Sequence, residues 1–140
     1  MAYLLAALGG ALGALARWGV AEAFGGRPGG WPWATLSANL TGCLLIGVLL
    51  AVLLARFPRS TRLRPFLAVG VLGGYTTYST FAVDAVRLTE AGAWVGAVGY
   101  VVASVLGGVA CVLLGLMAAR AVLHPSDSVL EELEAGEDET

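Results

Sequence analysis

The amino-acid sequence predicts an all-α integral membrane protein with four transmembrane helices. Only 13% of its 140 residues are charged and 58% are hydrophobic, whereas about 25% of the residues in a typical soluble domain are charged. The apolar residues fall into four runs, each close to the roughly 20 residues that a helix needs to cross a bilayer. Since these runs occupy most of the chain, we expect a single transmembrane domain over residues 1–124 and no second, soluble domain.

Residues 3–24 form the first expected span, and the glycine- and proline-rich segment 25–30 ends it as a loop. The start of the chain lacks the basic region and cleavage site of a signal peptide, so we expect it to remain as the first helix. Residues 33–55 form the second span, with Trp31 and Trp33 suited to the membrane interface. A loop with four arginines and two prolines then leads to the third span.

The third expected span, residues 66–86, differs from an ordinary transmembrane helix. Its central segment, residues 70–81, contains three glycines and four serines or threonines, and both glycine and β-branched threonine weaken a helix interior. We therefore expect the third helix to be broken, with backbone groups that face protein or a watery cavity and can bind an ion. The alternative is a continuous, glycine-rich packing stretch whose hydroxyls bond to the preceding turn.

The fourth expected span, residues 94–121, is longer than a bilayer requires and is expected to tilt or protrude. Seven of the ten acidic residues then follow between Asp127 and Glu139, whereas all eight basic residues are arginines in the body of the chain. Residues 125–140 have too little apolar surface to offset the entropy of ordering. We therefore expect them to form an acidic, disordered C-terminal tail.

Three polar residues lie deep within the apolar runs: Arg17, Asn39 and Ser104. An ionisable residue inside a membrane usually marks a functional site, although an arginine can also snorkel to the interface. An asparagine at this depth either serves a site or links two helices by a hydrogen bond. The sequence leaves both alternatives open for Arg17 and for Asn39.

The sequence contains no constellation typical of an enzyme. The only histidine, His124, follows the fourth span, and no span holds a carboxylate pair, a nucleophile with a base, or a phosphate-binding loop. Cys43 and Cys111 lack metal-site spacing and are expected to be small buried side chains. These absences favour a channel or a binding scaffold, and no nucleic-acid partner is expected.

Three short motifs lie in order on the first three spans. Residues 9–18 read GGALGALARW, residues 35–47 read TLSANLTGCLLIG and residues 70–81 read GVLGGYTTYSTF. They resemble the motifs G-G-x-x-G-x-x-x-R-[W/Y/F], T-L-x-x-N-x-x-G-x-x-x-x-G and G-x-x-G-G-x-T-T-F-S-T-F of the CrcB/Fluc family of fluoride channels. The resemblance covers residues 3–121 and leaves only the acidic tail outside.

The resemblance implies an antiparallel dimer of four-helix subunits, with two fluoride pathways along the subunit interface. It also implies a structural sodium ion at the break in the third helix, held by the backbone carbonyls of Gly73 and Thr76 from both subunits. We therefore expect a multi-pass protein of the cell (plasma) membrane that exports fluoride passively and selectively and so relieves fluoride toxicity.

The resemblance further implies which residues line the fluoride pathway. Asn39 would offer an amide N–H to the anion, and the rings of Tyr78 and Phe81 would offer their positive edges. Tyr78 stands where the family usually has phenylalanine, so its ring carries an additional hydroxyl. Arg17 would contribute positive potential. A polar track would consist of Thr77, Ser79, Tyr100 and Ser104.

Two other functions remain open from the sequence: a small proton-coupled exporter and a membrane scaffold without transport. A proton-coupled exporter needs a carboxylate inside the membrane. Glu22 lies at a helix end, and Asp84 is expected near the end of the third span. The sequence therefore favours a channel over an exporter.

The arginines bear on the orientation of the chain and on its partner. Both termini and the second loop are expected on one side of the membrane, which holds five arginines against two on the other side. Because positive residues in short loops favour the cytoplasm, this asymmetry predicts one fixed orientation with the termini inside. An antiparallel homodimer needs both orientations; it is still favoured because the set of pathway residues is complete, and an oppositely oriented paralogue is the alternative. The five arginines are Arg56, Arg59, Arg62, Arg64 and Arg120, and the two are Arg27 and Arg87.

Overall fold

The computed structural model describes residues 1–24 and 30–123. Its helical elements follow in the order α1 (Ala2–Phe24), α2 (Trp33–Arg56), η1 (Arg64–Leu72), α3 (Gly73–Tyr75), α4 (Tyr78–Glu90) and α5 (Trp94–Leu123). Four segments are long and apolar enough to cross a membrane, namely α1, α2, Arg64–Glu90 and α5. The prediction of an all-helical chain with four spans is confirmed, whereas the predicted tail, residues 125–140, lies outside the described residues.

The third segment, Arg64–Glu90, is longer at both ends than the sequence led us to expect. Pro65 lies in its first turn, where a helix needs no amide donor, so the proline does not delay the helix start. The first nine residues, Arg64–Leu72, form wider π-type turns. At the other end α4 continues to Glu90, four residues beyond the predicted end at Val86.

Two residues inside the third segment have an extended backbone. Thr76 has φ −79° and ψ 158°, and Thr77 has φ −147° and ψ 121°. Helical geometry therefore stops at Tyr75 and resumes at Tyr78. We refer to Thr76 and Thr77 as the interruption.

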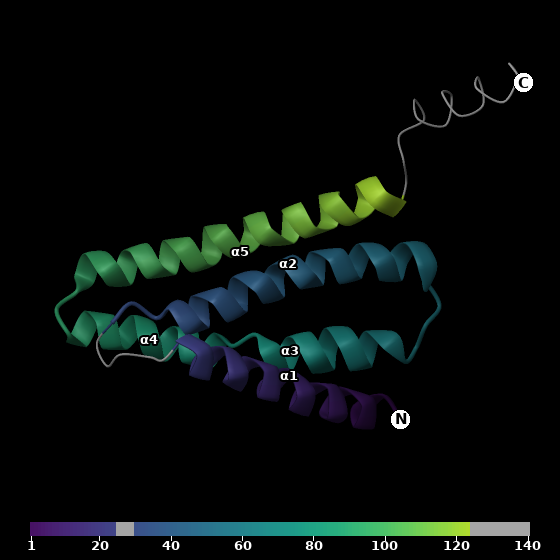
Figure 1. Ribbon diagram of the computed structural model, residues 1–140, viewed down its shortest axis with the longest axis horizontal. Coiled ribbons are helices and arrows are strands. Elements are labelled where there is room, and N and C mark those ends of the chain that lie inside the picture. The colour runs from purple at the N-terminus through teal and green to yellow at the C-terminus, as the bar shows by residue number, and fades with distance from the viewer. Residues whose placement is uncertain (25–29, 124–140) are drawn as a thin grey trace, which may run out of the picture.

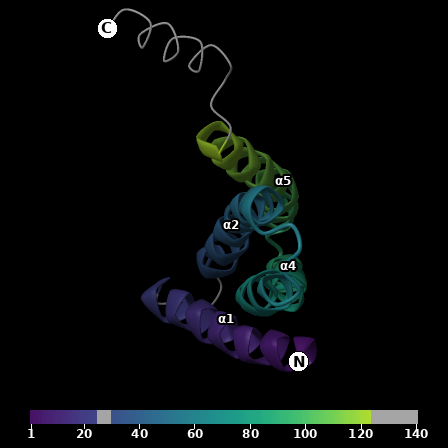
Figure 2. The same cartoon turned by 90° about the vertical axis from the view of Figure 1, so that its right-hand side faces the viewer.

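Helix α2 lies at the centre of the helical bundle. It packs against every other helical element of the described chain, whereas α5 packs only against α2 and α4. Helix α1 packs along η1 and α3 and otherwise touches only α2. Figure 1 shows α5 and α2 side by side, with the third segment and α1 beyond α2. In the end view of Figure 2, α2 again lies between α5 and α1.

Two helix pairs approach each other through glycines. A Cβ atom at Gly47 of α2 would overlap the carbonyl oxygen of Val112 in α5. Likewise, a Cβ atom at Gly13 of α1 would overlap the carbonyl oxygen of Val71 in η1. In lipid, where the hydrophobic effect does not drive helices together, such close backbone contact supplies packing energy. These contacts hold α5 against α2, and α1 against the first half of the third segment.

The outer surface of the subunit is apolar. Leu12 and Leu15 of α1 and Leu106 and Leu114 of α5 are each more than half exposed. A soluble protein would rarely present so large an apolar surface to water. The exposed leucines therefore suit contact with lipid or with another subunit.

Candidate functional site

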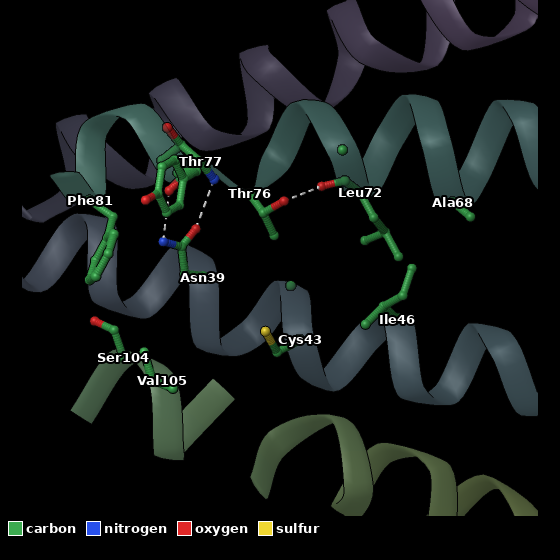
Figure 3. Close-up of a pocket in the computed structure, with 13 residues that line it drawn as sticks. Asn39, Cys43, Ile46, Ala68, Leu72, Thr76, Thr77, Phe81, Ser104 and Val105 are labelled. Atoms are coloured by element: carbon green, nitrogen blue, oxygen red, sulfur yellow. Dashed lines mark hydrogen bonds between the residues drawn. The ribbon is translucent and has the colours of Figure 1, made fainter. Parts of the chain in front are cut away.

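A cavity of about 450 Å³ lies between α2, the third segment and α5. Figure 3 shows that its polar side chains gather around the interruption, whereas Ile46, Ala68 and Leu72 form an apolar wall farther along. Seven of the residues singled out in the sequence line this cavity: Asn39, Gly73, Thr76, Thr77, Tyr78, Phe81 and Ser104. The other three, Arg17, Ser79 and Tyr100, do not line it.

Asn39 is bound to the backbone of the interruption through both of its functional groups. Its Nδ2 donates to the carbonyl oxygen of Thr77 at 2.9 Å, and its Oδ1 accepts from the amide of Thr77 at 2.8 Å (Figure 3). The side-chain amide thus replaces the hydrogen bonds that an uninterrupted helix would make. Since an amide nitrogen carries two hydrogens, one N–H remains beyond the bond to Thr77. That this N–H serves an anion stays a prediction.

The carbonyls of Gly73 and Thr76 lose their helical donors at the interruption. In an uninterrupted helix they would accept from the amides of Thr77 and Thr80, four residues further on. Those amides donate instead to Asn39 Oδ1 at 2.8 Å and to Thr77 Oγ1 at 3.1 Å. An unpaired carbonyl is costly inside a membrane, and bare carbonyl oxygens are suitable ligands for a cation.

The residues around these two carbonyls fit a bound sodium ion better than a transition metal. Within residues 1–24 and 30–123, no group of three or more His, Cys, Asp or Glu side chains could hold a metal ion. A cation at the interruption would therefore be bound by backbone oxygens, which suit hard cations. That such an ion binds here stays a prediction.

Arg17 of α1 contacts the third segment at Gly74, two residues before the interruption, and does not line the cavity. Its Nε donates to the carbonyl oxygen of Gly74 at 3.2 Å, and the side chain is half-buried. The guanidinium is thus attached to the third segment, a geometry that does not correspond to snorkelling toward the interface. Because Arg17 does not line the cavity, its predicted contribution to the pathway would act at a distance.

A row of aromatic rings leads from the surface of the subunit into its core. The ring centroids of Tyr78 and Phe81 lie 5.9 Å apart, and those of Phe81 and Tyr100 lie 5.4 Å apart. Trp31 meets Tyr100 edge-on at 6.0 Å. Tyr78 is 82% exposed, whereas Tyr100 is fully buried. The outermost ring therefore borders the cavity while most of its surface is left uncovered by the rest of the chain.

The four predicted polar-track residues occupy different environments. Thr77 and Ser104 line the cavity, whereas Ser79 is exposed outside it and Tyr100 is buried behind Phe81. The hydroxyl of Thr77 caps α4, since its Oγ1 accepts from the amide of Thr80 at 3.1 Å. The hydroxyl oxygens of Tyr100 and Ser104 are buried and find no hydrogen-bond partner among the described residues. A water molecule or an ion could satisfy them.

Asp84 and Thr35 form a polar contact that the sequence analysis missed. Thr35 Oγ1 donates to Asp84 Oδ2 at 2.7 Å, and the Asp84 side chain is only 13% exposed. Arg87 lies 3.9 Å from the other carboxylate oxygen. Asp84 lies six residues before the end of the third segment, at Glu90, and thus within its last two turns. Thr35 could have been found from its spacing, since it lies one helical turn before Asn39 on the same face.

Four apolar spans, three of which line a cavity with a polar end, are typical of a small multi-pass membrane protein of the channel or transporter class. A sequence model of the family described as "CrcB-like protein, Camphor Resistance (CrcB)" matches residues 4–116. The chain belongs to this family, and the resemblance seen in its motifs is confirmed.

Several relatives are similar to this chain over most of its length. The "Fluoride-specific ion channel FluC 2" of Nocardia farcinica is 46% identical over 120 residues, which cover 85% of this chain and 86% of the relative. The "Fluoride-specific ion channel FluC" of Paracoccus denitrificans is 47% identical over 118 residues, covering 84% and 94%. The protein of the same name from Chloroflexus aurantiacus is 43% identical over 117 residues, covering 81% and 90%.

Family membership also settles two broader predictions. The chain is a multi-pass protein of the cell membrane, because it combines four membrane-spanning segments with relatives that are named ion channels. It belongs to a family of channels and not of enzymes.

Proposed function

We propose that this chain forms a fluoride-selective channel that passes fluoride passively out of the cell. The observation that carries the proposal is the cavity at the interruption, which brings seven of the ten expected site residues together. Relatives that are 43–47% identical carry the name of fluoride-specific ion channels, which supports fluoride as the ion. Export of fluoride would protect the cytoplasm from its toxicity.

The side chains around the cavity suit a small, strongly hydrated anion. A pore must replace the water molecules that fluoride loses, and the cavity presents the amide of Asn39, the hydroxyl of Ser104 and the edge of Phe81. Each of these groups binds an anion weakly. Several weak sites in series allow an ion to enter and to leave again, which conduction requires.

The pathway is proposed to be completed by a second subunit in antiparallel orientation. Tyr78 lines the cavity and is nevertheless 82% exposed on its own subunit. A large aromatic ring with so little cover is suited to a partner that closes the cavity from the other side. With an antiparallel partner, the interruption of each subunit could meet that of the other near the middle of the membrane.

A structural sodium ion is proposed at this meeting point. Gly73 and Thr76 would hold it through their carbonyl oxygens, which lack their helical donors because Asn39 and Thr77 engage the amides concerned. Two such carbonyls from each subunit would supply four oxygen ligands. The ion would neutralise carbonyl groups that are otherwise costly in the membrane interior.

The partner is proposed to be a second copy of this chain, with an oppositely oriented paralogue as the alternative. The arginine-rich end of the subunit keeps the alternative open: Arg56, Arg59, Arg62, Arg64 and Arg120 are all exposed there. Reporters that are active on one side of the membrane, fused to the C-terminus, distinguish the two. Signal from both sides is expected for a homodimer, whereas signal from the cytoplasm alone would require a paralogue.

One observation favours a second candidate function, a proton-coupled exporter. Such a protein needs a carboxylate inside the membrane, and Asp84 is largely buried between α4 and α2. A passive channel and a coupled exporter differ in one measurable respect. Only the exporter can use a pH gradient to drive fluoride against the gradient of fluoride itself.

Fluoride efflux from liposomes tests the proposal. Purified protein is reconstituted into liposomes loaded with potassium fluoride, and valinomycin releases potassium so that anion efflux can follow. We expect rapid fluoride efflux and no chloride efflux from matched liposomes loaded with potassium chloride. Equal efflux of chloride would contradict selectivity, and uphill fluoride transport driven by a pH gradient would replace the channel with the exporter.

A further inference from the structure

We propose that Arg17 is a positioning residue that fixes the backbone of the interruption and thereby selects the carbonyls that bind the cation. This inference rests on the proposed sodium site. It assigns Arg17 a role different from the positive potential on the fluoride pathway that the family resemblance implies.

The first reason concerns the hydrogen-bond partners of the backbone carbonyls at the point where the helix stops. The last four carbonyls of a helix lack donors from the next turn, and here these belong to Gly73, Gly74, Tyr75 and the capping residue Thr76. The carbonyl of Leu72 is satisfied by the amide and the hydroxyl of Thr76, each at 2.9 Å. The carbonyl of Gly74 is satisfied by Arg17 Nε at 3.2 Å. The arginine thus removes one carbonyl from those that could bind a cation, whereas the neighbouring carbonyl of Gly73 lacks its helical donor, because the amide of Thr77 donates to Asn39.

The second reason is that the packing of α1 fixes the position of Arg17 along the third segment. Gly9, Gly13 and Arg17 follow one another at four-residue intervals, so they lie on one face of α1. Cβ atoms at Gly9 and Gly13 would overlap the carbonyl oxygens of Phe66 and Val71. Helix α1 therefore packs directly against the backbone of the third segment, and this contact places the guanidinium of Arg17 beside the carbonyl of Gly74.

The third reason is the position of Arg17 relative to the cavity. Helix α1 contributes no residue to the cavity wall, and in the described part of the chain it packs against neither α4 nor α5. Arg17 therefore has no direct contact with the pathway, and the group that it does contact is the backbone carbonyl of Gly74. The guanidinium is planar and offers its N–H donors in a fixed geometry, which suits it to hold a backbone carbonyl in one position.

The test compares sodium dependence in Arg17→Met and Arg17→Lys with that of the wild-type full-length protein. Arg17→Met keeps a long side chain but removes both the hydrogen-bond donor and the charge. Arg17→Lys keeps the charge but replaces the planar guanidinium with an ammonium group, whose donors are arranged differently. Gly19→Ala is the matched control on the same helix, because a Cβ atom at Gly19 meets nothing within 4 Å. Two readouts are followed as sodium replaces an inert organic cation: the melting temperature of the purified protein and the fluoride flux in liposomes.

We expect Arg17→Met to need an about tenfold higher sodium concentration for half-maximal thermal stabilisation, as for the loss of one hydrogen bond to a charged group. Its fluoride flux should return at high sodium, because the pathway itself is intact. Arg17→Lys should be shifted as well, although it preserves the charge, and Gly19→Ala should match the wild-type protein.

Three outcomes would overturn the inference. In the first, Arg17→Met binds sodium like the wild-type protein but loses flux at every sodium concentration, which would return Arg17 to the pathway. In the second, Arg17→Lys matches the wild-type protein in both readouts, so that charge alone is what matters. In the third, the wild-type protein conducts fluoride but shows no response to sodium, which removes the sodium site together with this inference. If Arg17→Met does not fold, the shift in Arg17→Lys decides the question.

Discussion

The α2–α5 pair and the third segment meet the same requirement in different ways: every backbone polar group in a membrane needs a partner. Helices α2 and α5 are uninterrupted, so their backbone groups bond within each helix. The third segment stops being helical at Thr76 and Thr77, and side chains from other helices take over there. Asn39 of α2 bonds to Thr77, and Arg17 of α1 bonds to Gly74.

This difference separates what holds the subunit together from what gives it a function. Between α2 and α5 the contact is tight and apolar, as at Gly47, so substitutions there should affect stability. At the interruption the carbonyls of Gly73 and Thr76 stay without helical donors. Substitutions there should alter ion binding more than folding. The predictions below test this separation, beginning with the largest expected effect.

Gly47→Val should abolish the packing of α2 against α5. A Cβ atom at Gly47 would overlap the carbonyl oxygen of Val112 and approach the amide of Leu116. Because backbone and not a flexible side chain would have to move, we expect a loss of about 3 kcal/mol or more in the free energy of unfolding. Unfolding of the purified protein in increasing denaturant, followed by circular dichroism, measures the loss.

The matched control for this substitution is Gly19→Val, where the added side chain meets nothing within 4 Å of its Cβ position. It should leave the unfolding free energy within about 0.5 kcal/mol of the wild-type value. Equal stability of Gly47→Val and Gly19→Val would mean that the α2–α5 contact is looser than the structure indicates.

Asn39→Asp should lower fluoride flux by about a hundredfold in a protein that still folds. The substitution removes the donor to the Thr77 carbonyl and places a negative charge on the wall of an anion pathway, where the repulsion is strong at low dielectric. Liposome flux under the conditions described above gives the measurement. Unchanged flux would place Asn39 outside the pathway.

Asn39→Leu sharpens this test because it removes both bonds to Thr77 without adding a charge. If Asn39 serves the anion directly, the aspartate variant should conduct less than the leucine variant. If Asn39 acts only by holding the interruption, the two variants should lose flux to a similar degree.

Much of the fold could be predicted from composition alone. Four long apolar runs gave the number of spans, and the structure contains four segments that are long and apolar enough to cross a membrane. The close approach of α2 and α5 was harder to place, because small residues are frequent along both helices. The backbone contacts between the two helices lie at Gly47 and Gly115.

Most residues of the site could be predicted from the sequence, whereas their hydrogen-bond partners could not. Motif positions identified Asn39 and Arg17, yet their partners on the third segment depend on how α1 and α2 pack in three dimensions. The extended backbone of Thr76 and Thr77 depends on the same packing. Asn39 can bond to the amide and the carbonyl of Thr77, in place of helical partners, only once α2 lies beside the third segment. The third segment extends beyond its expected bounds at both ends, because helix ends are the least certain feature of a sequence-based assignment.

Thr77→Ala should lower stability more modestly, by about 1 kcal/mol, which is typical for the loss of a helix N-cap. Thr77 Oγ1 accepts from the amide of Thr80 at 3.1 Å, and alanine leaves that amide without its partner. Thermal unfolding measures the loss. Thr77→Ser keeps a capping hydroxyl and should restore most of the stability, so an equal loss in both variants would contradict the capping role.

Thr76→Val should have the smallest effect, and it bears most directly on the proposed sodium site. The side chain of Thr76 donates to the carbonyl of Leu72 at 2.9 Å, but the proposed sodium ligand is its backbone carbonyl. Valine has the same shape and the same carbonyl, so we expect a loss of about 1 kcal/mol or less in stability. The sodium concentration for half-maximal thermal stabilisation should stay at the wild-type value.

Thr76→Pro provides the contrast at the same position. Proline removes the amide that donates to Leu72 at 2.9 Å, and it disfavours helical geometry at the preceding residue, Tyr75. The carbonyls of Gly73 and Thr76 would then point in new directions, so sodium stabilisation should disappear. If Thr76→Val removes the response to sodium while Thr76→Pro retains it, the ligand is the threonine side chain and not the backbone. In that case the backbone carbonyls at the interruption would not be the ion ligands. The interruption and the α2–α5 pair would then differ only in how closely their helices pack.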